Sequence, residues 1–306
     1  MTLLMATITH WIRLLFLLLI SYPFWAAANP IHVTDDTGQT ISIAQPARRI
    51  VALSPHIVET LFAAGAGSKI VGAVEYSDYP PNAKLIPRVG GYAGINLEVL
   101  ASLKPDLVIG WETGNSPGAI EKIRQLGIPV YLSQVNTIAQ IAVEIENFGQ
   151  LAGTQKIAMP ASEAFRAKLA GLTQTYSSRP TVSVFYQISE SPLMTIGGKQ
   201  IISNALSVCG GQNIFANLTP MAPVVTQEAV IAANPEIIMT SGMERINPQA
   251  LDIWKKWPKL TATQRQNFFF IDSDLINRNG PRIIEGTQML CKAIQTARDR
   301  RPSAKP

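Results

Sequence analysis

The sequence predicts an α/β fold made of two lobes, each built around a mainly parallel sheet. Three observations lead to this prediction: short apolar runs alternate with helical patterns, a long helical region divides the chain near its middle, and one helix–strand unit occurs twice. Strands that alternate with helices imply βαβ units and parallel pairing. Because ligands bind at the carboxyl ends of the strands in such sheets, we expect a ligand cleft between the two lobes.

The segment 1–28 has the order of a secretory signal peptide, so we exclude it from the fold. Arg13 precedes the apolar run "LLFLLLI", and Pro23 and the small residues Ala26–Ala28 follow it. An uncleaved anchor is the alternative, but the apolar run is too short to span a bilayer comfortably. The rest of the chain has only a mild, scattered excess of basic residues and no basic run with interleaved aromatic residues. We therefore expect no nucleic-acid partner.

The first lobe is expected over residues 29–150. The run "RIVALS" is mostly apolar, as a strand buried on both faces should be. In "PHIVETLFAAGAG", Pro55 suits the start of a helix and Gly65 or Gly67 its end. The runs "KIVGAVEY", "DLVIGW" and "IPVYLSQ" predict further strands, with a helix near residues 115–126.

A linking helix is expected over residues 151–178, and a second lobe over 179–306. Helical composition continues from Thr137 with no clear strand, and Pro160 should kink or restart the helix. The α/β pattern then resumes with the strands "TVSVFYQI" and "FFFIDSD". Helices are predicted over "QIISNALSVCGG", near Pro248–Trp257, and over "PRIIEGTQMLCKAIQ".

One helix–proline–strand unit occurs once in each lobe. The segment "LEVLASLKPDLVIGW" starts at Leu97 and "QEAVIAANPEIIMTS" starts at Gln227, so that Glu98 corresponds to Glu228. A carboxylate in the first turn of a helix is stabilised by the helix dipole, which accounts for either acid alone. The same acid in both lobes favours a partner that has two similar subunits.

The sequence contains few residues or motifs that could serve as the catalytic site of an enzyme. Only His32 and His56 remain after the signal peptide, and no H-E-x-x-H, G-x-S-x-G or P-loop motif is present. The stretch "GAGSKI" follows a helix and ends in Ile70, so we interpret it as a helix end rather than a dinucleotide site. Asp272 and Asp274 would have alternate orientations on a strand, which makes a poor acid–base pair. An exported enzyme remains the less favoured alternative.

Aromatic residues at the ends of predicted strands favour a binding function. Tyr76 follows "KIVGAVE", Trp111 follows "LVIG", and Tyr92 lies in "VGGYAGIN". Flat rings at the mouth of a cleft suit a large, rigid, partly apolar ligand. The alternative for each ring is ordinary packing within its lobe.

Three polar residues are further candidates for ligand contact. Asp274 and Arg278 lie four residues apart in the loop "SDLINRNGPR", where they could clamp polar edges of a ligand or form a surface ion pair. His56 begins the first helix at a strand end. It could ligate a metal centre, although a lone histidine there is more often a cap or a packed side chain.

The two cysteines predict one disulfide. Cys209 and Cys291 are an even number in an exported chain, for which a disulfide is the ordinary use. Two buried free thiols are the alternative.

Four segments resemble the periplasmic substrate-binding proteins of ABC importers for cobalamin, haem and ferric siderophores. They are "RIVALSPHIVETLFAAG", "VGAVEYSDYPP", "SNALSVCGGQNIF" with "SDLINRNGPR", and "INLEVLASLKPDLVIGW". The resemblance covers nearly all of the chain after the signal peptide and is greatest to the cobalamin-binding members. It implies two Rossmann-like lobes joined by a single long helix, with the ligand in the cleft between them. It also implies a periplasmic monomer that catalyses nothing and delivers a tetrapyrrole to the permease dimer of an inner-membrane ABC importer.

The resemblance also assigns roles to residues. It implies that cobalamin, or alternatively haem or a ferric siderophore, contacts Tyr76, Tyr92, Trp111, Asp274 and Arg278. It implies that Glu98 and Glu228 dock onto arginines of the two permease subunits, and that Cys209 pairs with Cys291.

Four positions depart from the pattern of the cobalamin-binding members. Ala222 stands where a Trp is expected, Ile188 and Met194 where Phe is expected, and Tyr92 where Trp is expected. The thioether of Met194 can still pack on a flat ring. Haem-binding relatives place an axial Tyr just before the same helix, so Tyr92 keeps haem as an alternative ligand.

Overall fold

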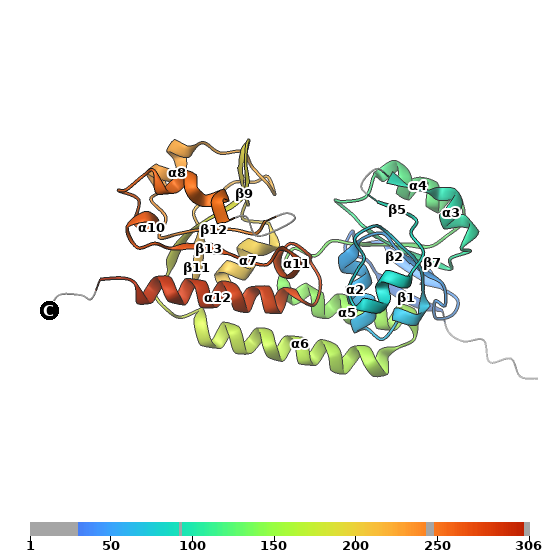
Figure 1. Cartoon of the computed structure of the whole chain (residues 1–306). Helices are drawn as coiled ribbons and strands as arrows, with labels where there is room; N and C mark the ends of the chain where they lie inside the picture. The colour runs from blue at the N-terminus through green and yellow to red at the C-terminus, as the bar shows by residue number, and fades with distance from the viewer. Residues whose placement is uncertain (1–29, 92–93, 243–247, 303–306) are drawn as a thin grey trace, which may run out of the picture. The chain divides into compact units, whose positions relative to one another are not determined.

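The structure, a computed structural model, describes residues 30–91, 94–242 and 248–302 (Figure 1). The predicted signal peptide and Tyr92 lie outside these described residues. Two mainly parallel sheets, one in each lobe, confirm the predicted α/β class. Within the described ranges no helix is both long enough and apolar enough to cross a membrane.

The first lobe contains a four-stranded parallel sheet with the strand order β4-β3-β7-β8. Its strands are β3 (Ile50–Ala52), β4 (Ile70–Ala73), β7 (Leu107–Trp111) and β8 (Val130–Ser133). Nearly all of their residues are buried, which explains why the sequence shows apolar runs there rather than alternation. The helices of this lobe are α2 (Pro55–Ala63), α3 (Leu97–Ser102) and α4 (Pro117–Gln125).

Two small hairpins and two short 3-10 helices complete the first lobe, and the sequence did not predict them. The hairpins pair β1 (Ile31–Thr34) with β2 (Thr40–Ile43), and β5 (Gly90–Gly91) with β6 (Gly94–Ile95). The 3-10 helices are η1 (Gly67–Lys69) and η2 (Pro81–Leu85). The turn of the first hairpin is held by Asp35, whose Oδ1 accepts from the backbone N–H groups of Thr37 and Gln39, both at 2.9 Å. Such short elements carry too little periodicity to be recognised.

The middle of the chain forms two helices, α5 (Ile138–Ala152) and α6 (Gln155–Tyr176). Gly153, in the left-handed region at φ 66°, ends α5. The prediction that Pro160 restarts the helix is wrong, because α6 continues through it. Proline lacks a backbone N–H, so Pro160, the sixth residue of α6, removes one hydrogen bond of this 22-residue helix. Helix α6 contacts α2 of the first lobe and α7 and α12 of the second, and is therefore the long helix that joins the lobes (Figure 1).

The second lobe contains a five-stranded sheet with the order β10-β9-β12-β13, in which β11 also pairs with β9. All pairings are parallel except that of β10. The strands are β9 (Val182–Glu190), β10 (Leu193–Thr195), β11 (Gly211–Asn213), β12 (Ile237–Thr240) and β13 (Phe268–Phe270). The helices are α7 (Ile201–Val208), α8 (Gln227–Ala233), η3 (Pro248–Leu251), α9 (Asp252–Lys255), α10 (Thr261–Gln264), α11 (Ser273–Ile276) and α12 (Ile283–Asp299).

Two sequence predictions about the second lobe have clear outcomes. Cys209 and Cys291 form a disulfide between the end of α7 and helix α12, so the free-thiol alternative is wrong. Asp272 does not lie on a strand. It is the N-cap of α11, where its Oδ1 accepts from the backbone N–H of Asp274 at 2.9 Å.

The repeated unit has the same local structure in both lobes. Helices α3 and α8 are capped by Asn96 and Thr226, whose side-chain oxygens accept from backbone N–H groups in the first turn. Glu98 and Glu228 are exposed in the first turns. Each helix is followed by a residue at φ 45°, then by a proline and a buried strand.

Candidate ligand-binding site

A pocket of about 320 Å³ lies at the carboxyl ends of β3, β4 and β7 in the first lobe. Its walls come from segments that directly follow these strands and from the hairpin β5–β6, and they include Leu53, Pro55, Tyr76, Ile95, Trp111 and Ala119. The pocket lies where ligands bind in open parallel sheets. The structure therefore brings two of the predicted aromatic residues, Tyr76 and Trp111, to one pocket.

The ring of Trp111 is positioned by the loop that follows it. A Cβ atom at Gly114 would lie 1.9 Å from Cε3 of Trp111, so only glycine leaves room for the ring. Asn115 Oδ1 accepts from the backbone N–H of Trp111 at 2.6 Å, and Asn115 Nδ2 donates to the carbonyl of Leu53 at 3.0 Å. These bonds tie the end of β7 to the end of β3. The indole Nε1 of Trp111 is buried and has no hydrogen-bond partner among the described residues.

Tyr76 lies on the same pocket in an unusual backbone conformation. Its φ is 62°, a left-handed value that is costly for a residue with a Cβ atom, and its side chain is 74% exposed. Residues held in such conformations cluster at functional sites. The ring of Tyr76 is thus exposed at the pocket, whereas the ring of Trp111 is packed against its loop.

His56 lies behind the pocket and is not among its wall residues. Its side chain is buried, its Nδ1 lies 2.7 Å from Ser54 Oγ, and its ring meets Trp111 edge-on at 5.4 Å. Burial lowers the pKa of His56 to about 4, so it is neutral at neutral pH. Among the described residues no cluster of three or more His, Cys, Asp or Glu side chains is arranged to hold a metal ion. The structure gives His56 a supporting position behind Trp111.

Arg278 and Asp274 do not line this pocket, but Arg278 contacts the first lobe close to Tyr76 in the sequence. Its Nη1 donates to Asp78 Oδ1 at 2.7 Å and to Glu59 Oε1 at 3.2 Å, and its Nη2 lies 3.1 Å from Asp274 Oδ1. Asp78 is two residues from Tyr76 and donates its backbone N–H to the Tyr76 carbonyl at 3.0 Å. Burial disfavours the charge on Asp78, but the hydrogen bond and the charge of Arg278, with smaller contributions from a backbone hydrogen bond and Arg282, together outweigh burial and lower the pKa of Asp78. Arg278 therefore does not form only a surface ion pair with Asp274, because it also pairs with two acids of the first lobe.

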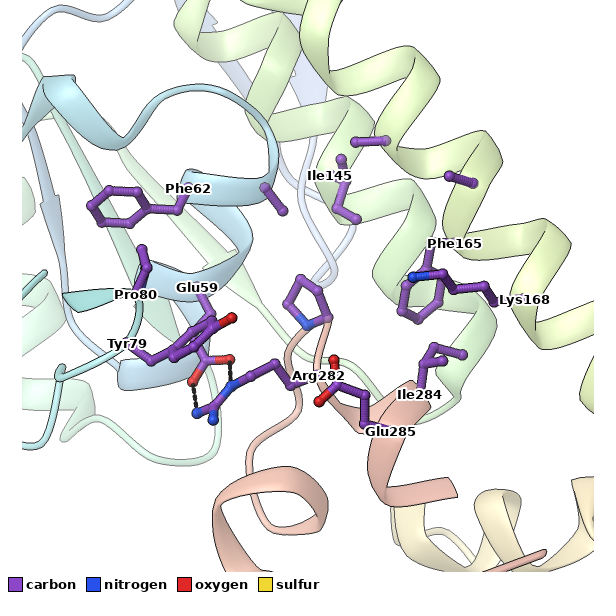
Figure 2. A pocket seen from close by; sticks show the side chains of 14 residues that line it. Glu59, Phe62, Tyr79, Pro80, Ile145, Phe165, Lys168, Arg282, Ile284 and Glu285 are labelled. Atoms are coloured by element: carbon purple, nitrogen blue, oxygen red, sulfur yellow. Dashed lines mark hydrogen bonds and ion pairs between the residues drawn. The ribbon is translucent and has the colours of Figure 1, made fainter. Parts of the chain in front are cut away.

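Glu59 is the buried centre of this cross-lobe contact (Figure 2). Its side chain, on α2, is 1% exposed. Arg282 donates to both of its carboxylate oxygens, at 2.9 and 2.7 Å, and the same guanidinium lies 3.9 Å from the ring centre of Tyr79. We call Glu59, Asp78, Asp274, Arg278 and Arg282 the inter-lobe ion cluster. It fastens the loop before α12 to the first lobe and so fixes the position of Arg278 against Glu59 and Asp78.

The sequence predicted only part of this cluster. Asp274 and Arg278 were expected at the ligand, but Glu59, Asp78 and Arg282 were missed. One signal was available, because Glu59 interrupts the otherwise apolar helix stretch "IVETLF", and a buried acid needs a partner. Its arginine partners could not be found by spacing, since they lie 219 and 223 residues away.

A second pocket of about 320 Å³ adjoins the Glu59–Arg282 ion pair. Figure 2 shows Phe62 and Pro80 on one side and Ile145, Phe165 and Lys168 on the other, with Glu285 near Arg282. None of the predicted ligand residues lies on its walls. We therefore take the pocket at Tyr76 and Trp111 as the candidate ligand site.

The departures from the family pattern in the second lobe lie close together. Met194 is half-buried on β10 and forms a backbone bridge with Val224, so the segment after Ala222 runs beside it. Ala222 is exposed, and Ile188 packs against the main core of the lobe. Two of these departures, Met194 and Ala222, therefore belong to one local surface.

The chain has two α/β lobes, a pocket at the ends of parallel strands and an ion cluster across the lobes. A pocket in this place is typical of ligand-binding proteins. The model of the periplasmic binding protein family matches residues 50–275, and the chain belongs to this family. It is accordingly a periplasmic binding protein and not an enzyme.

The chain is similar to proteins named as vitamin B12-binding proteins. It is 37% identical to that of Vibrio campbellii over 257 residues, which cover 84% of this chain and 92% of the relative. It is 35% identical to that of Photorhabdus laumondii over 246 residues, covering 80% and 87%. The crystal structure of the periplasmic vitamin B12-binding protein of Vibrio cholerae superposes with a TM-score of 0.76 at 37% identity, covering 83% of this chain and 98% of that one.

Proposed function

We propose that this protein captures cobalamin or a close corrinoid in the periplasm and delivers it to an inner-membrane ABC importer. The observation that carries the proposal is the 37% identity to vitamin B12-binding proteins over more than four fifths of the chain. The pocket with Tyr76 and Trp111 at its edges supports it, because flat apolar rings suit the face or edge of a macrocycle. A pocket of about 320 Å³ takes only part of a corrinoid, so the rest of the ligand contacts the second lobe.

The two lobes make different contributions in this proposal. Trp111 and Tyr76, with Tyr92, provide apolar surface from the first lobe. Arg278 and Asp274 provide charged hydrogen bonds to the polar edge of the ligand, and Met194 packs against the macrocycle. The inter-lobe ion cluster holds Arg278 in place before the ligand arrives, which reduces the cost of ordering it on binding.

The ligand is tested by titrating the purified protein with cyanocobalamin, hemin and a ferric siderophore, using calorimetry or tryptophan quenching. We expect saturable binding of cyanocobalamin at sub-micromolar concentration. Tight binding of hemin with no response to cyanocobalamin would refute the proposal and favour a haem carrier. Arg278→Ala should weaken cyanocobalamin binding about tenfold or more, as expected for the loss of a charged hydrogen bond. Unchanged affinity in this variant would remove Arg278 from the ligand site.

Delivery rests on the matched acids of the repeated unit. Glu98 and Glu228 are both exposed, in the first turns of α3 and α8, and meet cations of two permease subunits. The double variant Glu98→Ala, Glu228→Ala should keep its affinity for cyanocobalamin and lose transport. Undiminished uptake of labelled cyanocobalamin by cells that carry only this variant would contradict the docking role.

A further inference from the structure

Each lobe has an apolar hollow beside the helix that carries its matched acid. In the first lobe a hollow of about 400 Å³ lies between α3 and α4 and is lined by Leu97, Glu98, Ala101, Lys122, Gln125 and Leu126. Glu98 and Ala101 are three residues apart and share one face of α3. Leu126 remains 53% exposed although its surroundings are apolar.

The second lobe has its own hollow, of about 600 Å³, beside α8. Its walls include Ile231 of α8 and, from the connection between α9 and α10, Lys256, Trp257, Lys259 and Leu260. Ile231 lies three residues after Glu228, as Ala101 lies after Glu98, so it shares a face with the acid. Trp257 is 41% exposed. We call these two hollows the N-socket and the C-socket.

The two sockets occupy corresponding places in the repeated unit. When Glu98 is matched to Glu228, Ala101 corresponds to Ile231. Leu126 corresponds to the residue just before Trp257, and both positions follow the next helix of their lobe. The connection then differs between the lobes. The chain passes from β7 to β8 within residues 112–129, whereas it needs residues 241–267 to pass from β12 to β13. The longer connection includes Trp257 and Lys259, so the C-socket is the larger and the more basic.

The chemistry of both sockets suits a protein partner. Exposed apolar residues gathered in a hollow and rimmed by charges are typical of interaction sites, and Trp is enriched among residues that dominate interface energies. The N-socket has Glu98 and Lys122 in its walls beside apolar residues. The C-socket has Lys256 and Lys259 in its walls, and Glu228 lies one helical turn before its wall residue Ile231. In Figure 1, α3, α4 and α8 lie on the side of residues 31–302 that is away from α6, so one partner can reach both sockets.

We infer that the N-socket and the C-socket each receive an apolar side chain from one of the two permease subunits, beside the cation that meets Glu98 or Glu228. This inference rests on the proposed function and extends its docking surface from two acids to two acid-and-socket pairs. Charge alone gives weak, salt-sensitive contacts between exposed groups, whereas an anchored apolar side chain slows dissociation. Because the two sockets differ in size and charge, the two similar subunits of the permease would meet different surfaces on the two lobes.

The test uses spheroplasts of the protein's own host that lack the chromosomal copy, to which purified protein and labelled cyanocobalamin are added. The variants are Leu126→Gln, Trp257→Gln and both together. The matched control is Met159→Gln on α6, which removes an apolar side chain that is 45% exposed and far from both sockets in sequence. We expect the double variant to bind cyanocobalamin normally but to need about tenfold more protein for half-maximal uptake. Trp257→Gln should have the larger single effect, and Met159→Gln none.

The outcomes separate this inference from the proposed function. If the unaltered protein supports no uptake, the proposed function fails and the sockets fail with it. If the Glu98→Ala, Glu228→Ala variant loses uptake while the Leu126→Gln, Trp257→Gln variant matches the unaltered protein, the sockets are overturned and the acids stand. A uniform loss of cyanocobalamin affinity in the socket variants, measured by calorimetry, would also overturn the inference.

Discussion

The two lobes contain the same helix–proline–strand unit but use its end differently. In the first lobe, Asp106 accepts from the backbone N–H groups of Arg48 and Arg49 at 2.8 and 2.9 Å, and β7 ends in Trp111 at the pocket. In the second lobe, the corresponding Glu236 accepts from the side chains of Arg265 and Arg301. The residue that corresponds to Trp111 is Ser241, whose hydroxyl lies 2.8 Å from Asn277 Oδ1.

This difference teaches that the duplicated part is the scaffold and not the site. Caps, positive-φ residues, prolines and buried strands recur because they define the backbone path of one α/β unit. The residues at the strand ends are free to differ because they face a pocket or another loop. In this protein the first lobe supplies aromatic surface, and the second supplies the arginines of the inter-lobe ion cluster.

The largest expected effect comes from removing a buried ion-paired acid, and it is compared with the loss of an ion-paired acid that is partly exposed. Glu59→Ala leaves Arg278 and Arg282 without their central partner at the junction of the lobes, where the Glu59 side chain is 1% exposed. We expect the free energy of unfolding to fall by about 3 kcal/mol, as when one partner of a buried pair is removed. Urea denaturation followed by circular dichroism measures this change.

The matched control is Glu236→Ala in the second lobe. Glu236 also has two arginine partners, but its side chain is 19% exposed, and we expect a loss of about 1 kcal/mol or less. Equal losses for Glu59→Ala and Glu236→Ala would show that burial does not distinguish the two clusters. The inter-lobe ion cluster would then have no special part in joining the lobes.

The second prediction concerns an acid of the first lobe that has no arginine. Glu144 on α5 is buried, and among the described residues neither carboxylate oxygen accepts a hydrogen bond of ordinary length and angle, although the Ser133 hydroxyl lies near. Burial raises the pKa of Glu144 to about 8, against a smaller opposing contribution from Ser133 and with a small further rise from the charge of Asp36. The folded protein therefore binds this proton more tightly than the unfolded chain. The free energy of unfolding should fall as the pH rises from about 4.5 towards 8.

Glu144→Gln removes this titration while keeping the size of the side chain. The difference in unfolding free energy between the variant and the unaltered protein should grow in favour of the variant from about pH 5 to about pH 8.5, by at least about 2 kcal/mol. Urea titrations at the two pH values measure the difference. Glu163→Gln, at an exposed position on α6, is the control and should show no such gain. A Glu144→Gln difference that does not change with pH would mean that the carboxyl is charged in the folded protein.

The smallest expected effect tests the aromatic wall of the first lobe. In Gly114→Ala the new methyl group would overlap the ring of Trp111, which must then move. We expect cyanocobalamin binding to weaken about tenfold, or about 1.4 kcal/mol, with little change in unfolding. The control Gly118→Ala lies four residues on, where the nearest atom to the new Cβ is 3.8 Å away. Calorimetry that finds the same affinity for both variants would show that the orientation of Trp111 does not matter to the ligand.

Much of the fold could be predicted because local sequence patterns indicate its helices and strands. Apolar runs indicated the buried strands, Pro55 and Gly65 bounded α2, and the matched order of acid, proline and apolar run identified the repeated unit. The weaker predictions involved competing local signals. Pro160 suggested a helix restart that Gly153 actually provides, and "FFFIDSD" suggested a strand that ends at Phe270 because Asp272 caps a helix.

By itself the sequence determined the two-lobed α/β class, the pairing of Cys209 with Cys291 as one disulfide, and the gathering of Tyr76 and Trp111 at strand ends. These follow from periodicity, residue count and the rule that parallel strands end at one edge. Only the tertiary structure decided that Arg278 shares Glu59 with Arg282, that Gly114 makes room for Trp111, and that each matched acid lies beside a socket. Such contacts depend on which distant segments meet, and no local pattern encodes that meeting.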